Sequence, residues 1–253
     1  MVKNVTKKII FCALSIFLTL GSCAYKTGQE NTNNGRKTRK ESTIKENQTK
    51  KRNNENNTTK KSKKKNAEKL DGAEVFKQYS SAVFLIYTAN DYQKFQGSGF
   101  FIGEDGLAVS NYHVFQGTNV GYEQIKIGEN KYNVSEVIAK SKEEDFILFR
   151  VNCKNKEYIP IASSKPLVGE KVYAIGSPRG FENTISDGVV SQWRGDNLMQ
   201  ISVPIDHGSS GGALINEYGE VVGITSGTFY EGSQANVNYA WSIDAVKAHI
   251  NNY

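Results

Sequence analysis

A serine lies inside a glycine-rich stretch in the C-terminal third of the chain. The sequence there reads Gly208-Ser209-Ser210-Gly211-Gly212, and an apolar segment follows. Glycine adopts backbone conformations that other residues avoid, and it lets a substrate approach the main chain. A nucleophilic serine needs such a turn, because its hydroxyl must be exposed while backbone N–H groups point at the developing oxyanion. The stretch is therefore a candidate nucleophile turn; a Gly/Ser loop between two strands is the alternative.

A serine hydroxyl is a weak nucleophile unless a base, usually histidine, accepts its proton. The chain has three histidines, at positions 113, 207 and 249. His113 directly follows a small apolar segment, and a strand end can hold its ring rigidly. His207 lies in the same turn as the serine and would have to approach across it, and His249 belongs to a terminal segment that we expect to be helical and solvent-facing. We predict His113 as the base.

A third group must orient the imidazole and stabilise its charged form. Asp145 opens an apolar segment, Asp-Phe-Ile-Leu-Phe-Arg-Val, where a carboxylate would be partly desolvated and held. Glu143 and Glu144 are the alternatives, although they are typical of a solvated turn. The order His113, Asp145, Ser210 puts the first two residues in one half of the domain and the serine in the other. The site is then expected in the cleft between the halves.

Short strands separated by turns fill the chain from about residue 80 to 243. A first set of six is expected at 82–89, 97–102, 106–110, 122–127, 131–139 and 146–151, and a second set at 171–175, 184–193, 199–203, 213–215, 221–226 and 238–242. Pro160 and Pro166 lie between the sets. The pattern predicts an all-β domain, residues 71–253, of two packed six-stranded antiparallel barrels at about 80–160 and 168–243. Short helices are expected at 71–79 and 244–250.

Several motifs in this order resemble the chymotrypsin-fold, trypsin-like serine peptidases, and specifically the bacterial HtrA/Deg-type branch, over residues 72 to 248. The matching stretches are Gly97–Ile102, Ser110–Val114, Asp145–Leu148, Ala174–Phe181, Thr184–Ser191 and Gly208–Gly212. The resemblance implies a serine endopeptidase that cuts protein or peptide substrates without a cofactor. It makes Ser210, rather than Ser209, the nucleophile, and it implies an oxyanion hole formed by the backbone N–H groups of Gly208 and Ser210.

The sequence departs from the family at three points. Ser209 stands where the HtrA branch usually has Asn and activatable zymogens have Asp, so activation by an inserted N-terminal ammonium is not expected. Ala213 replaces the usual Pro. The chain ends soon after its last expected helix, so a C-terminal PDZ domain is not expected.

The resemblance also implies a specificity pocket lined by the residue about six before the nucleophile and by the strand after it. The corresponding residues are Pro204, Thr225, Ser226 and Gly227. Because none is charged, we expect preference for a small or medium apolar P1 side chain. A gap in the correspondence would instead bring Asp206 or Asp187 into the pocket.

The N-terminus has the pattern of an export signal. Basic Lys3, Lys7 and Lys8 precede an apolar run from residue 9 to 20, and Leu-Gly-Ser-Cys23 follows. This resembles a bacterial lipoprotein signal, in which residues 1–22 are removed and Cys23 is lipidated. The alternatives are an ordinary secretory signal and an uncleaved anchor. The prediction is a lipid-anchored protein of the bacterial cell envelope.

Positive charge is concentrated before the expected domain. Residues 1–70 carry 18 Lys and Arg against 5 Asp and Glu, whereas residues 71–253 carry 14 against 21. We expect residues 23–70 to be a disordered, basic, Asn- and Lys-rich tether, either a plain spacer or one that also contacts anionic surfaces. Nucleic acid is not an expected partner, because no basic excess lies in the folded part.

The sequence leaves two other classes of function as alternatives. Scattered histidines and unpaired cysteines, with Cys153 alone in the expected domain, argue against a metal hydrolase. A trypsin-fold domain kept as a lipid-anchored binding or adhesin module, without activity, is the stronger rival. For an active enzyme the family implies quality control or processing of envelope proteins.

Overall fold

The computed structural model describes residues 68–253 except 120, 156, 182, 228–236 and 251–253. The predicted signal peptide, Cys23 and nearly all of the predicted tether lie outside the described residues. In the part of the chain that is described, no helix has the length and apolar character needed to cross a membrane.

The domain begins with the expected short helix. Helix α1 (Gly72–Tyr79) starts at Asp71, whose carboxylate accepts the backbone N–H of Glu74, while the Glu74 carboxylate accepts the N–H of Asp71. These reciprocal bonds satisfy two backbone donors that a helix start leaves unpaired. Val75 and Tyr79 lie on the buried face, and a 3₁₀ turn, η1 (Ser80–Ala82), leads into the first strand.

The first half of the domain is one antiparallel sheet in the strand order β5-β4-β1-β2-β3-β7-β6. Its strands are β1 (Val83–Ala89), β2 (Lys94–Phe101), β3 (Leu107–Ser110), β4 (Gln124–Ile127), β5 (Asn130–Tyr132), β6 (Val134–Ser141) and β7 (Phe146–Val151). Strand β7 is a nearly continuous apolar run and is almost wholly buried, as a strand inside a sheet should be. A single helical turn, α2 (Tyr112–Phe115), follows β3.

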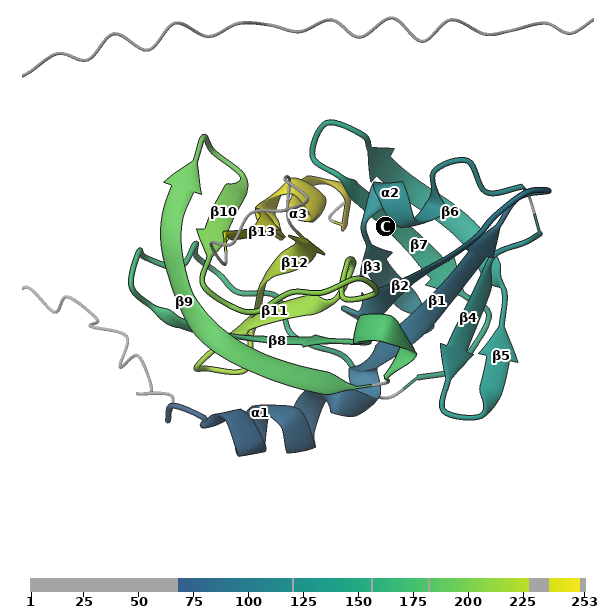
Figure 1. Ribbon diagram of the computed structural model, residues 1–253. Coiled ribbons are helices and arrows are strands. Elements are labelled where there is room, and N and C mark those ends of the chain that lie inside the picture. Colours follow the sequence, from purple (N-terminus) through teal and green to yellow (C-terminus); the bar gives the residue numbers. More distant parts are fainter. Residues whose placement is uncertain (1–67, 120, 156, 182, 228–236, 251–253) are drawn as a thin grey trace, which may run out of the picture. The chain divides into compact units, whose positions relative to one another are not determined.

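The second half is a closed six-stranded barrel in the order β10-β13-β12-β11-β8-β9. Its strands are β8 (Lys171–Gly176), β9 (Thr184–Arg194), β10 (Leu198–Ile201), β11 (Ala213–Asn216), β12 (Val221–Gly227) and β13 (Asn238–Ser242). A 3₁₀ turn, η2 (Pro178–Gly180), lies between β8 and β9, and α3 (Asp244–Ile250) ends the domain. Figure 1 shows the barrel and the first sheet side by side.

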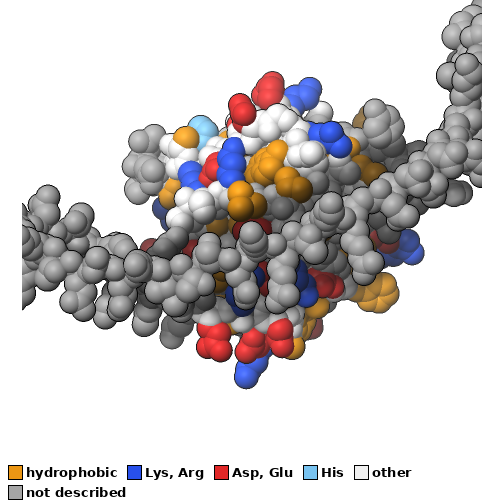
Figure 2. Space-filling view, turned by 90° about the vertical axis from the view of Figure 1, so that its left-hand side faces the viewer, with side chains coloured by type: hydrophobic (Ala, Val, Ile, Leu, Met, Phe, Trp, Pro, Cys, Tyr) orange, Lys and Arg blue, Asp and Glu red, His pale blue; other side chains and the backbone are white. Residues whose placement is uncertain are grey.

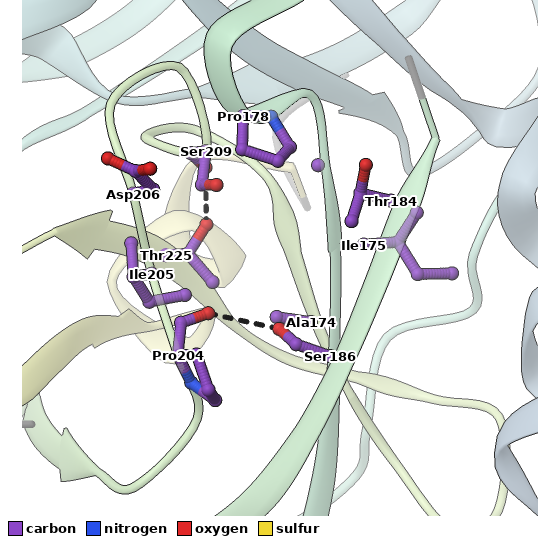
Figure 3. Close-up of a pocket in the computed structure, with 11 residues that line it drawn as sticks. Ala174, Ile175, Pro178, Thr184, Ser186, Pro204, Ile205, Asp206, Ser209 and Thr225 are labelled. Carbon is purple, nitrogen blue, oxygen red and sulfur yellow. Dashed lines mark hydrogen bonds between the residues drawn. The ribbon is translucent and has the colours of Figure 1, made fainter. Parts of the chain in front are cut away.

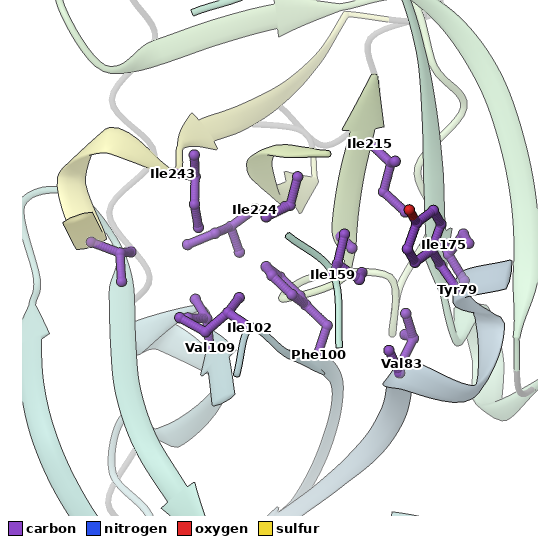
Figure 4. Packing of buried hydrophobic residues seen from close by; sticks show 14 of the residues in the cluster. Tyr79, Val83, Phe100, Ile102, Val109, Ile159, Ile175, Ile215, Ile224 and Ile243 are labelled. Atoms are coloured by element: carbon purple, nitrogen blue, oxygen red, sulfur yellow. The ribbon is translucent and has the colours of Figure 1, made fainter. Parts of the chain in front are cut away.

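A shared apolar core joins the two halves. Phe100 and Val109 of the first sheet belong to one buried cluster with Ile175, Ile215 and Ile224 of the barrel (Figure 4). Each half also has its own apolar interior. Because interiors pack densely and yield little, this shared cluster fixes the halves against each other.

The all-β, trypsin-like fold agrees with the sequence prediction, but the first half differs from the expected six-stranded barrel. It has seven strands and stays open between its edge strands β5 and β6. The expected strand at 131–139 divides near Asn133 into β5 and the start of β6. Strand β6 has no fully buried residue, shifts register twice against β7 and is not paired with β5.

Charged groups are mixed on the surface of the barrel. On the β9–β10 side, seen in Figure 2, acidic and basic side chains lie close together among separate apolar ones. An ion pair of the barrel joins Lys171 of β8 to Asp187 of β9 at 3.2 Å, with the two side chains 44% and 59% exposed. Exposed pairs of this kind contribute little to stability.

Candidate active site

His113 and Asp145 meet at the end of β3. His113 lies in α2, and Asp145 ends the turn before β7, in a left-handed conformation (φ +46°). The backbone N–H of His113 donates to Asp145 Oδ1 at 2.9 Å, and His113 Nδ1 lies 2.8 Å from Asp145 Oδ2. The buried Asn111 donates from Nδ2 to the Asp145 carbonyl at 2.9 Å. The carboxylate is therefore hydrogen-bonded to both the main chain and the ring of His113.

These bonds fix the tautomer of His113. An ionised carboxylate only accepts hydrogen bonds, so Nδ1 must carry the proton that faces Asp145. The lone pair is then left on Nε2. Asp145 is largely shielded, with 15% of its side chain exposed, whereas the His113 side chain is 43% exposed. The ring can therefore receive a proton from the solvent side.

A hydroxyl from the second half also contacts this carboxylate. Ser226 Oγ, at the end of β12, donates to Asp145 Oδ2 at 2.8 Å. The sequence placed Ser226 only in a specificity pocket and missed this contact. Glu143 and Glu144, the sequence alternatives to Asp145, contact Ser141 and Asn197 instead.

The glycine-rich stretch is a tight turn held by the first sheet. Gly208 and Gly211 have φ of +94° and +87°, and a Cβ at Gly211 would lie 2.1 Å from the backbone oxygen of Ser98. Ser98 of β2 donates from its N–H to Ser210 O at 2.8 Å and from its hydroxyl to Gly208 O at 2.7 Å. Glycine is thus required at Gly211 both by the left-handed backbone and by the close approach.

Ser210 and His113 face the same cavity. This hollow of about 380 Å³ is lined from the first half by Phe95, Gln96, His113 and Val114, and from the second half by Arg179, His207, Gly208 and Ser210. Within the described residues no hydrogen bond joins Ser210 to His113. Such bonds are often long in a site without substrate and tighten when substrate binds.

The backbone N–H groups of Gly208 and Ser210 have no acceptor among the described residues. The carbonyl just before Gly208, that of His207, accepts the N–H of Arg179 at 2.7 Å. A trans peptide directs its C=O and N–H to opposite sides, so the Gly208 N–H points away from Arg179. Two donors beside Ser210 are therefore available to a ligand.

The four residues predicted for the specificity pocket do not line one common cavity. Pro204 and Thr225 line a separate cavity of about 410 Å³, together with Ile205, Asp206 and Ser209 among others (Figure 3). This cavity shares no lining residue with the one that contains Ser210. The Thr225 hydroxyl is bonded to Ser209 O at 2.7 Å, so it is engaged within the turn itself.

Gly227 is the predicted pocket residue that borders the serine, because a Cβ there would lie 3.6 Å from Ser210 Oγ. The segment after it, 228–236, lies outside the described residues. Asp187 pairs with Lys171, and Asp206 pairs with Arg179 at 2.7 Å. His207 is exposed, and its contact with Asp206 is made through its backbone.

Comparison with known proteins identifies the family of the domain. The model of the trypsin-like peptidase domain matches residues 97–224. A probable periplasmic serine endoprotease DegP-like of Hahella chejuensis is 34% identical over 158 residues, 58% of this chain and 33% of its own. Protease Do-like 1, chloroplastic, of Arabidopsis thaliana is 28% identical over 165 residues, 59% of this chain and 37% of its own. The chain thus spans about a third of the length of these relatives.

Solved structures show the same fold. The serine endoprotease of Yersinia pestis has a TM-score of 0.63 at 23% identity, covering 70% of this chain and 64% of its own. The active form of the Rv3671c protease of M. tuberculosis has a TM-score of 0.64 at 19% identity, covering 73% and 87%. With a family model that matches half of its length, this chain belongs to the trypsin-like peptidase domain family.

Proposed function

We propose that this chain is a serine endopeptidase in which Ser210, His113 and Asp145 act as a catalytic triad. The observation that carries the proposal is the pair of hydrogen bonds that Asp145 accepts from the main chain and the ring of His113, which leaves the lone pair of Nε2 free beside the cavity of Ser210. Nucleophile, base and orienting carboxylate are the three parts that acyl transfer requires.

The reaction would proceed in two halves. Ser210 Oγ attacks the substrate carbonyl carbon while His113 Nε2 takes the hydroxyl proton, and Asp145 stabilises the imidazolium. The proton then passes to the leaving amine as the C–N bond breaks, which leaves an ester on Ser210. Water, deprotonated by Nε2, attacks this ester, and the proton returns to Ser210 as the carboxylic acid departs.

The oxyanion of each tetrahedral intermediate would accept hydrogen bonds from the N–H groups of Gly208 and Ser210. Both groups are unpaired in the described part of the chain, and the turn that carries them is fixed by Ser98. Preorganised donors of this kind stabilise charge that develops in the transition state without reorganisation. Removal of one such donor typically lowers kcat by about 10²–10³.

Substrates are proposed to be extended segments of proteins. The curated relatives named above include a probable periplasmic serine endoprotease, which supports an envelope location. Lipid attachment at Cys23, and quality control or processing of envelope proteins, remain part of this proposal. A small or medium apolar P1 side chain is proposed because Gly227 borders Ser210 Oγ without a side chain of its own.

Cleavage of casein by the full chain tests the proposal, with Ser210→Ala as the inactive control. We expect fragments from the wild type and none from the variant, and Ser209→Ala should retain cleavage. Equal failure of the wild type and Ser210→Ala, with both proteins folded, would instead support the binding module.

A further inference from the structure

We propose that Arg179 and Asp206 form a clamp that holds the Gly208 N–H toward the active-site cavity, so that these two residues position the oxyanion hole. The inference rests on the proposed peptidase function, and it assigns these residues a positioning role. It also accounts for how the turn keeps its shape with Ser209 where activatable relatives would use a carboxylate and an inserted N-terminus.

The Gly208 turn needs an external hold because glycine itself selects neither orientation of the preceding peptide. If the peptide between His207 and Gly208 rotated by half a turn, the His207 carbonyl would take the side now occupied by the Gly208 N–H, opposite Arg179. Gly208 lies at φ +94°, and glycine reaches positive and negative φ with similar ease. One donor of the oxyanion hole therefore depends on contacts that favour one of two peptide orientations.

Arg179 supplies two of these contacts from the η2 turn. Its backbone N–H donates to His207 O at 2.7 Å, and its Nε donates to Asp206 Oδ2 at 2.7 Å. Arg179 itself is left-handed, with φ +50° and ψ +25°, a conformation that costs a residue with a side chain about 1–2 kcal/mol. The bonds Gly180 N–H to Ser177 O and Phe181 N–H to Pro178 O hold the turn in that shape.

Asp206 supplies the other side of the clamp. Its Oδ1 accepts the His207 N–H at 2.7 Å, and its carbonyl accepts the Ser209 N–H at 2.9 Å. The pKa of Asp206 is lowered, mainly by the His207 N–H and then by Arg179, as expected for a carboxylate whose charged form is held. His207 is thus bonded at both its N–H and its C=O, which restrains the peptide on either side of it.

The solvent exposure of Arg179 and Asp206 determines how much their loss should lower kcat. The side chains of Arg179 and Asp206 are 71% and 42% exposed, so their mutual attraction is screened by solvent. Loss of the Arg179 side chain alone should lower kcat by about 2- to 5-fold, the range of an exposed pair. Asp206→Ala also removes the acceptor of the His207 N–H. We expect about a 10- to 100-fold loss, less than deletion of an oxyanion donor.

The test compares the full-length wild type with Asp206→Ala, Asp206→Asn and Arg179→Gly. Glycine at position 179 keeps the N–H and tolerates the left-handed backbone, so only the side chain is removed. The readouts are kcat and KM on a fluorogenic peptide and the rate of reaction with a fluorophosphonate. We expect kcat and the labelling rate to fall while KM changes by less than about 3-fold. Asp206→Asn, which keeps an acceptor for His207, should be impaired less than Asp206→Ala.

Lys171→Ala is the matched control, because it breaks an exposed ion pair on the same barrel far from the turn in sequence. It should leave kcat unchanged. At 1 M salt the Debye length falls to about 3 Å and the attraction within this exposed pair weakens, so the difference between wild type and Arg179→Gly should shrink. In Arg179→Gly/Asp206→Ala the two losses should be less than multiplicative, because both act through one peptide.

Asp206→Ala and Arg179→Gly within 2-fold of the wild type in kcat, with native thermal melting, would overturn the clamp while leaving the peptidase proposal intact. If the wild type itself neither cleaves nor reacts, both proposals fall. Should Asp206→Ala fail to fold, the surface variant Arg179→Gly and its salt dependence carry the same test.

Discussion

Asp145→Asn should remove most of the activity by reversing the tautomer of His113. Oδ1 of Asp145 accepts the backbone N–H of His113, so the amide oxygen of an asparagine must stay on that side. Its NH₂ group then takes the place of Oδ2 and faces Nδ1 of His113 and the Ser226 hydroxyl. Both of these groups lose the oxygen to which they donated. Nδ1 must accept, the proton moves to Nε2, and the base that Ser210 needs is lost.

In a Ser-His-Asp triad this change of tautomer lowers kcat about 10⁴-fold, which raises the barrier by about 5.4 kcal/mol at 1.36 kcal/mol per tenfold. Steady-state hydrolysis of a fluorogenic peptide at pH 7.5 measures it, with thermal melting as a check of the fold. Glu143→Gln, which neutralises an exposed carboxylate beside the site, should leave kcat within 2-fold. A folded Asp145→Asn protein with more than a tenth of wild-type kcat would refute the role assigned to this carboxylate.

Three further outcomes are expected. Ser226→Ala removes the hydroxyl that donates to Asp145 and should lower kcat by about 10-fold with little change in KM, the effect of a hydrogen bond to a charged group. An unchanged kcat would show that the bond is dispensable. Gly211→Ala should lower the free energy of unfolding, measured in urea, by about 2–6 kcal/mol, because backbone strain and a clash with the main chain add. In the control Gly195→Ala the residue is also left-handed (φ +72°) but has open space around it, so the free energy of unfolding should fall by only about 1–2 kcal/mol. The pKa of Asp206 is lowered in the fold, so the ionised carboxylate should stabilise the domain above about pH 4, and this contribution should be lost as the pH falls through the lowered pKa. The melting temperatures of wild type and Asp206→Ala should therefore converge below pH 4 and differ by a constant amount above pH 5.

Residue type and order were enough to predict that His113 and Asp145 lie side by side. The apolar segments before His113 and after Asp145 pair as β3 and β7, so the two residues must end side by side. The glycines at 208 and 211 indicated a turn with left-handed backbone, and both have positive φ. These features follow from local sequence, because strand ends and glycine turns are set by neighbours in the chain.

Contacts between the halves could not be predicted in the same way. Ser98 reaches Gly208 and Ser210 across more than 100 positions of sequence, and Ser226 reaches Asp145 across 81. Neither serine has a local pattern that names its partner. The open edge of the first sheet was missed for a related reason, since closure depends on whether two distant edge strands can both bury apolar faces.

Positions carried over from the family did not predict which residues line the cavity of Ser210. Pro204 and Thr225 lie at the expected distances from Ser210 along the chain, yet both line the cavity of Ser209 rather than that of Ser210. Distance along the chain from the nucleophile therefore does not determine which cavity a side chain lines. Of the four predicted pocket residues, Gly227 is the one that borders Ser210 Oγ.

The central claim is that Ser210 is made nucleophilic by His113. Peptide mapping by mass spectrometry after reaction with a fluorophosphonate tests it most directly, because the adduct reports which oxygen attacked. We expect the adduct on Ser210 in the wild type, none on Ser209, and a loss of labelling in His113→Ala. An adduct on Ser209, or equal labelling of Ser210 in the wild type and His113→Ala, would contradict the account.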